Sequence, residues 1–287
     1  MIYRRRVSPL HSARAGAGCL YCLALAIASL VLSAPLALGA VGLGVVCASA
    51  GARVWSEVRR ALVWAVPLAL MIVVINALVT RNGLTVIWRL GDLPVLGQSD
   101  VTLEATVYGA VLGLRAICLV LCGALYTAAV DPDEVLRMFR RVSFRSALTA
   151  TLATRLVPVL ARDARRLAES QRCRPGRPPG RVALMRVAST GVLDRALDVA
   201  AALEVRGYAG ARRPPRAHRP WSRQDLAFTS AAGALLVLAI VARAEGLAPF
   251  SAYPLLHAPL GAAQAGTAAG LLACALAPFA VRRGMRG

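Results

Sequence analysis

Long apolar stretches alternate with short polar segments along most of the 287-residue chain. A helix needs about 17 to 25 predominantly apolar residues to cross a bilayer. Six stretches meet this requirement, and they lie near residues 17–33, 34–51, 61–79, 105–130, 226–243 and 258–281. The pattern predicts an all-α integral membrane protein with about six transmembrane helices.

The charged residues decide how the first two stretches are counted, because only Ser33, Ala34 and Pro35 separate them. The chain carries a net charge of +20, and all 34 of its basic residues are arginine. With six spans and the N-terminus inside, the inner segments hold 30 arginines and the outer loops hold Arg81, Arg89 and Arg243. Cytoplasmic loops of membrane proteins are enriched in arginine and lysine. The distribution therefore favours six spans with both termini in the cytoplasm, whereas merging the first two spans would divide the first seven arginines between the two sides.

These spans divide the chain into three parts. We expect a membrane region with four spans over residues 1–130, a cytoplasmic region over 131–225, and a membrane region with two spans over 226–287. The outer segment from Thr80 to Glu104 mixes glycine, proline and apolar residues. This mixture leaves open whether the segment dips back into the membrane edge.

The cytoplasmic region begins with a predicted helix start, in which Asp131 is the N-cap, Pro132 the first helical residue and Glu134 a capping-box acid. Beyond Ser146 an amphipathic helix follows, and we expect Pro158 to kink or break it. Its apolar face contains Leu152, Leu156, Val159, Leu160 and Leu167, and its polar face contains Arg155, Arg162, Arg165, Arg166, Glu169 and Arg172. A second amphipathic helix is predicted from about Ala183 to Arg206, with Val192, Ala196, Val199 and Leu203 on one stripe.

Both amphipathic helices end in an arginine that directly precedes a helix breaker. Arg174 stands before Pro175, and Arg206 stands before Gly207. An arginine in the last turn stabilises the negative end of a helix, and a following glycine is the favoured left-handed cap. The same ending also projects a guanidinium, whose planar donors suit insertion into a cleft of a partner protein. The repetition on two helices favours the second interpretation.

Other polar residues give few indications of chemistry. Arg115 and Asn76 lie within spans, where Arg115 needs a partner or a protein interior, and Glu104 leaves that pairing open. Cys19 and Cys22 form a single CxxC at the start of an apolar stretch, and the three histidines are scattered. We therefore expect neither a metal site nor a cofactor. Nucleic-acid binding is not expected either, because arginine-rich inner loops already explain the charge and aromatic residues make up only 5% of the chain.

The order of four spans, two long cytoplasmic helices ending in X-Arg-X and further spans resembles the transmembrane T component of energy-coupling factor transporters, the CbiQ-like subunit. The segments that carry the resemblance are "DPDEVLRMFRR", "LVPVLARDARRLAESQRCRPG" and "DVAAALEVRGYAG". In that family each coupling helix ends in a motif, commonly Ala-Arg-Gly, whose arginine contacts an ABC-type ATPase. By position these motifs are Cys173-Arg174-Pro175 and Val205-Arg206-Gly207, which keep the central arginine but differ at their flanks.

The resemblance implies a non-catalytic coupling subunit that transmits ATPase motion to a separate substrate-binding membrane subunit, the S component. Its partners would be two ABC-type ATPase subunits or a fused ATPase, the S component and the lipid bilayer of a bacterial or archaeal cell. Vitamins and transition-metal ions such as cobalt or nickel are both open as substrates.

Other classes remain as alternatives. A conventional ABC permease would form the substrate path itself, but would have one short coupling helix rather than two long ones. A lipid or prenyl transferase would need paired carboxylates, for which Asp131, Asp133 and Glu134 come closest, yet helix capping explains those acids. A channel or carrier acting alone would place polar residues through several spans.

Overall fold

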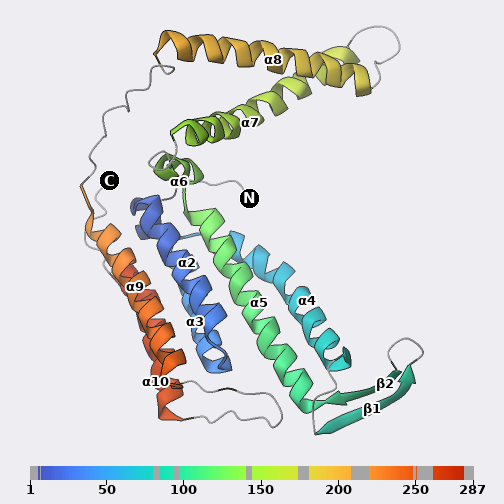
Figure 1. The fold of residues 1–287 in the computed structure, drawn as a ribbon, viewed down its shortest axis with the longest axis vertical. Coiled ribbons are helices and arrows are strands. Elements are labelled where there is room, and N and C mark those ends of the chain that lie inside the picture. Colours follow the sequence, from blue (N-terminus) through green and yellow to red (C-terminus); the bar gives the residue numbers. More distant parts are fainter. Residues whose placement is uncertain are drawn as a thin grey trace. The chain divides into compact units, whose positions relative to one another are not determined.

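Helices occupy all six predicted apolar stretches in the computed structural model of the chain (Figure 1). The structure describes residues 6, 8–79, 85–93, 97–139, 144–173, 181–207, 220–247, 250 and 261–280. The chain forms two compact units, of which unit 1 comprises Met1–Val135 with Trp221–Gly287 and unit 2 comprises Leu136–Pro220. The chain therefore leaves unit 1 once, after Val135, and returns to it once, at Trp221.

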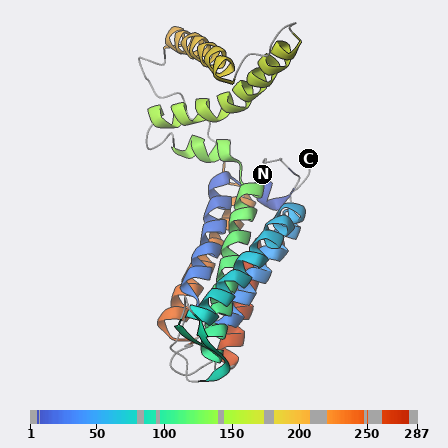
Figure 2. The same ribbon diagram turned by 90° about the vertical axis from the view of Figure 1, so that its right-hand side faces the viewer.

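Unit 1 is a bundle of apolar helices that run side by side in both ribbon views (Figures 1 and 2). A short helix, α1, precedes the bundle over Pro9–Ser12. The bundle helices are α2 (Ala15–Val31), α3 (Pro35–Gly51), α4 (Trp55–Val79), α5 (Leu103–Ala129), α9 (Arg223–Ala244) and α10 (Ala262–Ala280).

Four helices of unit 1, namely α4, α5, α9 and α10, are long and apolar enough to cross a membrane within the described part of the chain. Two more apolar helices, α2 and α3, have 17 residues each and are shorter than the other four. At about 1.5 Å per residue they measure roughly 25 Å, less than the hydrocarbon core of a typical bilayer. Four candidate spans are thus present, and the count of six depends on whether this shorter pair also crosses.

The bundle consists of two groups of helices. One group pairs α4 with α5, while in the other α9 packs against α2 and α10, and α10 also packs against α3. Helix α5 joins the two groups, because it also packs against α2 and α3. An aromatic cluster joins the second group, since the Tyr21 ring lies edge-on to Phe228 at 5.3 Å and Phe228 lies edge-on to Phe279 at 5.4 Å. The Tyr21 hydroxyl donates to the carbonyl oxygen of Ala275 at 2.6 Å, which ties α2 to α10.

Small residues allow these helices to approach closely. A β-carbon placed on Gly44 of α3 would lie 2.9 Å from Cβ of Ala275 in α10. One placed on Gly113 of α5 would lie 3.1 Å from the carbonyl oxygen of Ala69 in α4. Close backbone approach at small residues is the usual way for membrane helices to associate, because lipid tails supply no hydrophobic drive between them.

The segment between α4 and α5 forms a β-hairpin. Strand β1 (Val86–Leu93) pairs antiparallel with β2 (Gly97–Thr102), and Arg89 lies opposite Asp100. The hairpin is a departure from the expected all-α architecture within the described residues. It leads directly into α5, whose first turn is capped by the Thr102 hydroxyl accepting from the Ala105 N–H.

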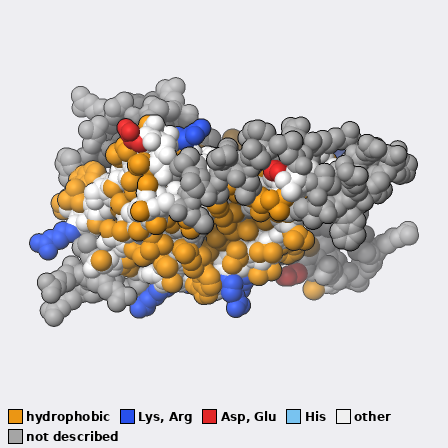
Figure 3. Space-filling view, turned by 90° about the horizontal axis from the view of Figure 1, so that it is seen from below, with side chains coloured by type: hydrophobic (Ala, Val, Ile, Leu, Met, Phe, Trp, Pro, Cys, Tyr) orange, Lys and Arg blue, Asp and Glu red, His pale blue; other side chains and the backbone are white. Residues whose placement is uncertain are grey.

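The outer surface of unit 1 is apolar. Trp64 of α4 is 79% exposed, and Leu70 and Val237 lie exposed on α4 and α9. Figure 3 shows hydrophobic side chains over most of the coloured surface on one face. A water-soluble protein does not expose so much apolar surface, whereas lipid tails cover it at no cost. The fold is that of a membrane protein.

Unit 2 contains two long helices, α7 (Phe144–Arg172) and α8 (Arg181–Val205). The helix leading into it, α6 (Pro132–Phe139), starts where the sequence predicts, with an Asp131 carboxylate oxygen accepting the Asp133 N–H at 2.9 Å. Of the kink or break expected at Pro158, the break does not occur, since α7 continues through this residue. A single proline removes one backbone hydrogen bond, which a helix of 29 residues can tolerate.

Candidate functional site

The end of α8 has the geometry of a glycine-terminated helix. Gly207 has a φ of +71°, in the left-handed region that favours glycine. Its N–H donates to the Glu204 carbonyl oxygen at 2.8 Å, and the Arg206 N–H donates to the Ala202 carbonyl oxygen at 3.2 Å. The backbone of Arg206 is thereby held at the point where the helix stops.

The side chains at this end face solvent. Val205 is 90% exposed, and Arg206 and Gly207 are also exposed. Among the residues that the structure describes, the Arg206 guanidinium has no hydrogen-bond or ion-pair partner. A charge that merely capped its own helix would bond to the last carbonyls. Arg206 is instead placed so that its donors are available to another molecule.

The end of α7 is described only as far as Cys173. This residue is exposed, and its N–H donates to the Glu169 carbonyl oxygen at 3.3 Å. The other two residues of the predicted motif, Arg174 and Pro175, lie outside the described residues.

The surface of α8 carries large apolar side chains that the described residues of unit 2 leave exposed. Within the described part of the helix, Val199 and Leu203 are half-buried, and the remaining side chains are exposed. The large apolar side chains among the exposed ones are Val182, Met185, Val187, Val192, Leu193, Leu197 and Val205. The predicted stripe of Val192, Ala196, Val199 and Leu203 is thus buried only in part. An apolar patch of this kind marks an interaction surface.

An ion pair joins α7 to α8. The Arg195 guanidinium of α8 donates to the Asp163 carboxylate of α7. Beside this pair lies a hollow of about 450 Å³, lined by Leu160 and Leu167 from α7 and by Asp194 and Asp198 from α8, among others. Both partners of the ion pair are more than a third exposed, so the pair orients the helices without contributing much stability.

The intramembrane Arg115 has a backbone partner rather than an acidic one. Its Nη2 donates to the carbonyl oxygen of Leu32 at 2.9 Å. Leu32 is the C-cap of α2, so the arginine satisfies a carbonyl at the negative end of that helix. Glu104, the alternative considered from the sequence, accepts instead from the hydroxyl and N–H of Thr85. Arg115 therefore anchors the α2–α3 turn to α5.

Asn76, the other polar residue predicted within a span, bonds to its own helix. Its amide Nδ2 donates to the Ile72 carbonyl oxygen at 3.0 Å. Its Cβ lies where α4 meets Gly109 of α5, at 3.0 Å from a β-carbon placed on that glycine. This arrangement assigns Asn76 to helix packing rather than to a path for a polar substrate.

The cysteines and histidines do not assemble into a metal centre in the part of the chain that the structure describes, since no group of three or more potential ligands comes together there. Cys22, Cys118 and Cys122 are buried among the bundle helices. Free cysteines in such positions behave as small apolar residues.

The sequence analysis missed one polar cluster, at the start of α9. Asp225 is a buried carboxylate that caps its own helix and also bonds to Arg14, which precedes α2. The capping of α9 could have been predicted from the sequence. Ser222 is followed three residues later by an acid, just before an apolar stretch, and this is a capping-box pattern. No local pattern indicates the contact between Asp225 and Arg14, because the two residues are 211 positions apart.

Two comparisons with known proteins bear on these features. The protein-family model described as "Cobalt transport protein", CbiQ, matches residues 6–218, which is more than half of the chain and includes α7, α8 and both predicted X-Arg-X motifs. No protein in a search of curated proteins matches the chain significantly.

Proposed function

The chain belongs to the CbiQ family of cobalt transport proteins, and from this membership we propose that it is the transmembrane coupling subunit of an energy-coupling factor importer. In this role it hydrolyses nothing itself. Two ATPase subunits, or a fused ATPase, bind unit 2 on the cytoplasmic side, and a separate S component in the membrane binds the substrate.

The observation that carries this proposal is the exposed Arg206 at the end of α8. Gly207 stops the helix, so the guanidinium extends beyond the last turn with its donors free among the described residues. A planar guanidinium forms several hydrogen bonds to carboxylates or backbone carbonyls in a cleft. The uncovered apolar side chains of α8 supply the contact area that such an arginine needs around it.

The proposed mechanism passes through both coupling helices. When ATP binding closes the ATPase pair, the cleft that holds Arg206 moves, and a second cleft holds Arg174 at the end of α7. Unit 2 follows this motion and passes it to unit 1 through the two chain connections near Val135 and Trp221. Unit 1 then reorients the S component.

The six-span topology is part of the proposal. Unit 1 has four candidate spans, and the shorter α2 and α3 would cross as a pair with both chain ends on the cytoplasmic side. The arginine distribution supports this orientation, since the described outer segments retain few of the 34 arginines.

Cobalt ion is the substrate favoured by the description of the matching family. The S component is expected to hold that ion, because unit 1 offers no cluster of metal-ligating side chains among its described residues. Vitamins stay as the second substrate class to be tested.

Reconstitution tests this function directly. The chain is co-expressed with a candidate ATPase pair and S component, purified in detergent and placed in vesicles. ATP-driven ⁵⁷Co²⁺ uptake is expected only with all components present. Uptake that needs no S component would favour a conventional permease, and uptake by the chain alone would overturn the whole assignment.

The double variant Arg174→Ala with Arg206→Ala tests the docking arginines. Truncating a central interface arginine costs about 2 kcal/mol or more, so ATPase association should weaken by roughly 30-fold per arginine. Co-purification and uptake are the measurements. Arg186→Ala is the matched control, because Arg186 is another exposed arginine of α8 but lies away from its end. If the double variant assembles and transports as well as the control, these arginines do not dock the ATPases.

A further inference from the structure

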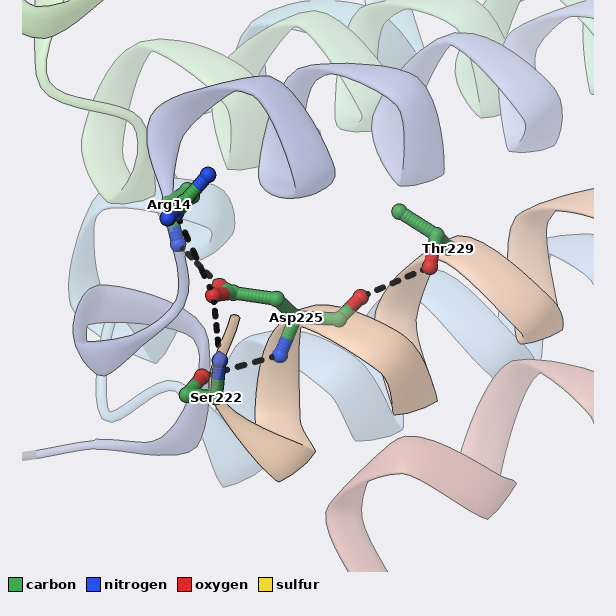
Figure 4. Close-up of polar contacts among 4 residues, drawn as sticks. All are labelled: Arg14, Ser222, Asp225 and Thr229. Carbon is green, nitrogen blue, oxygen red and sulfur yellow. Dashed lines mark hydrogen bonds and ion pairs between the residues drawn. The ribbon is translucent and has the colours of Figure 1, made fainter. Parts of the chain in front are cut away.

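Asp225 is a buried acidic residue that lies where the chain returns from unit 2 to unit 1. Its side chain is 1% exposed, and it lies three residues after Ser222, the N-cap of α9 (Figure 4). One carboxylate oxygen accepts the Ser222 N–H at 2.9 Å, while the Ser222 hydroxyl accepts the Asp225 N–H at 3.1 Å. This reciprocal capping box alone would account for an acid at this position.

The same carboxylate also bonds to a distant part of the chain. Its other oxygen accepts the backbone N–H of Arg14 at 2.7 Å, and the Arg14 Nε lies 3.5 Å from the oxygen that caps α9. Arg14 is the N-cap of α2 and has no side-chain cap of its own. One carboxylate therefore serves the positive ends of two helices, α2 and α9.

Two further contacts surround this pair. The Arg14 guanidinium lies over the ring of Trp221, 5.4 Å from its centroid, in a cation–π contact. The Ser12 hydroxyl donates to the side-chain oxygen of Gln224. Trp221 is the first residue of unit 1 after the chain leaves unit 2. The segment from Ser12 to Arg14 therefore contacts the returning chain where it re-enters unit 1.

The position of this joint matters because the two connections enter different groups of helices. The outgoing connection leaves from α5, which packs most extensively against α4 and less against α2 and α3. The returning connection enters α9, which packs against α2 and α10. Without the joint, a displacement arriving at Trp221 would reach α9 first and α2 only through apolar contacts along their length, such as that of Tyr21 with Phe228.

We propose that Asp225 is a positioning residue that fastens α9 to α2, so that motion arriving through the returning connection moves both helices as one body. The proposal rests on the coupling function stated above. It assigns the returning connection a body made of α9, α2 and α10, which adjoins α5 of the outgoing connection where α2 packs against α5.

The test compares variants that separate the joint from the cap. Asp225→Asn retains an oxygen for the Ser222 N–H but has no charge for Arg14, and Arg14→Gln removes the guanidinium while keeping the backbone N–H that donates to Asp225. Ser222→Ala is the matched control, because it deletes the hydroxyl bond that caps α9 and leaves both Arg14 contacts in place. A merely structural role predicts that all three variants lose folded protein and activity together.

The first readout is ⁵⁷Co²⁺ uptake per ATP hydrolysed in vesicles holding the complete complex. Asp225→Asn should lower this ratio by roughly fivefold or more, the lower end of coupling between sites, while ATP hydrolysis and complex assembly persist. Arg14→Gln should lower it less, because the backbone N–H of residue 14 still donates to Asp225. The double variant should lose no more than Asp225→Asn alone, because Asp225→Asn already removes the charge that the Arg14 guanidinium contacts. Equal ratios in Asp225→Asn, Ser222→Ala and the unmodified chain would overturn the proposal.

The second readout needs no substrate and so separates this proposal from the proposed function. Spin labels are placed at Leu23 of α2 and Val237 of α9, both exposed, in a chain whose native cysteines are replaced. The distance between them should stay narrow in the unmodified chain and in Ser222→Ala, and should broaden in Asp225→Asn. If the distribution of spin-label distances in Asp225→Asn is unchanged, the proposal is wrong even if uptake is observed. If the distribution broadens, the proposal is supported even if cobalt is not the substrate.

Discussion

At the scale of single residues, Gly207 controls where the exposed arginine of α8 stands. Its backbone adopts a left-handed conformation that costs other L-residues about 1–2 kcal/mol. No neighbouring atom lies within 4 Å of a β-carbon placed on this glycine. The requirement is therefore one of backbone conformation and not of space.

Replacing Gly207 with alanine should weaken docking without touching Arg206. The strained cap frays the last turn of α8, so the guanidinium loses its fixed position and the ATPases bind less tightly, by up to about tenfold for about 1.4 kcal/mol. Co-purification of the ATPases at graded salt is the measurement. Gly191→Ala serves as control, because Gly191 lies inside α8 with open space around it and should gain about 0.8–1 kcal/mol of helix stability. Equal losses in both variants would contradict a role for the left-handed cap.

Arg115 shows which properties of a single residue could be predicted from the sequence and which could not. The cost of an arginine at membrane depth predicts that it needs a partner, and the structure supplies one. That partner is a backbone carbonyl 83 residues away, and a carbonyl has no signature in the sequence. The helix end at Arg206 was predictable because Gly207 follows directly in the sequence, whereas the contact between Arg14 and Asp225 depends on how distant helices pack.

At the scale of helices and strands, the apolar stretches predicted the bundle helices well, because a long apolar segment in lipid must satisfy its backbone as a helix. The hairpin of β1 and β2 was not predicted, since its glycines and proline obscure any alternation of apolar and polar residues. The packing of the bundle helices in two groups could not be predicted from the sequence either. It depends on small residues such as Gly109 and Gly113 of α5, which form a GxxxG pattern facing α4.

A leucine at Gly109 should therefore separate α4 from α5. Even a β-carbon at this position would lie 3.1 Å from the Val73 Cα, so the backbone of α4 must move. Overpacking of this kind costs about 1–3 kcal/mol and should lower the melting temperature of the detergent-solubilised protein. Gly123→Leu in the same helix is the control, since nothing lies within 4 Å of its β-carbon position. The packing account fails if the two variants melt alike.

At the scale of the whole molecule, the orientation in the membrane can be tested with a native thiol. Cys173 is exposed at the end of α7, whereas the other exposed cysteine, Cys47, lies on an apolar helix of unit 1. A membrane-impermeant maleimide should label inside-out vesicles and not intact cells, because the arginine distribution predicts that unit 2 is cytoplasmic. Cys173→Ser should abolish this labelling. Labelling of Cys173 in intact cells would reverse the proposed topology.

The joint between Arg14 and Asp225 also constrains how the protein is made. Its two residues are 211 positions apart, and all of unit 2 is translated between them. At about 5–20 residues per second, the ribosome needs roughly 10–40 s to reach Asp225 after it has added Arg14 to the chain. During this interval the N-terminus of α2 lacks the Asp225 carboxylate that accepts its Arg14 N–H. The bundle can close fully only after α7 and α8 have been made, so every finished unit 1 already carries unit 2.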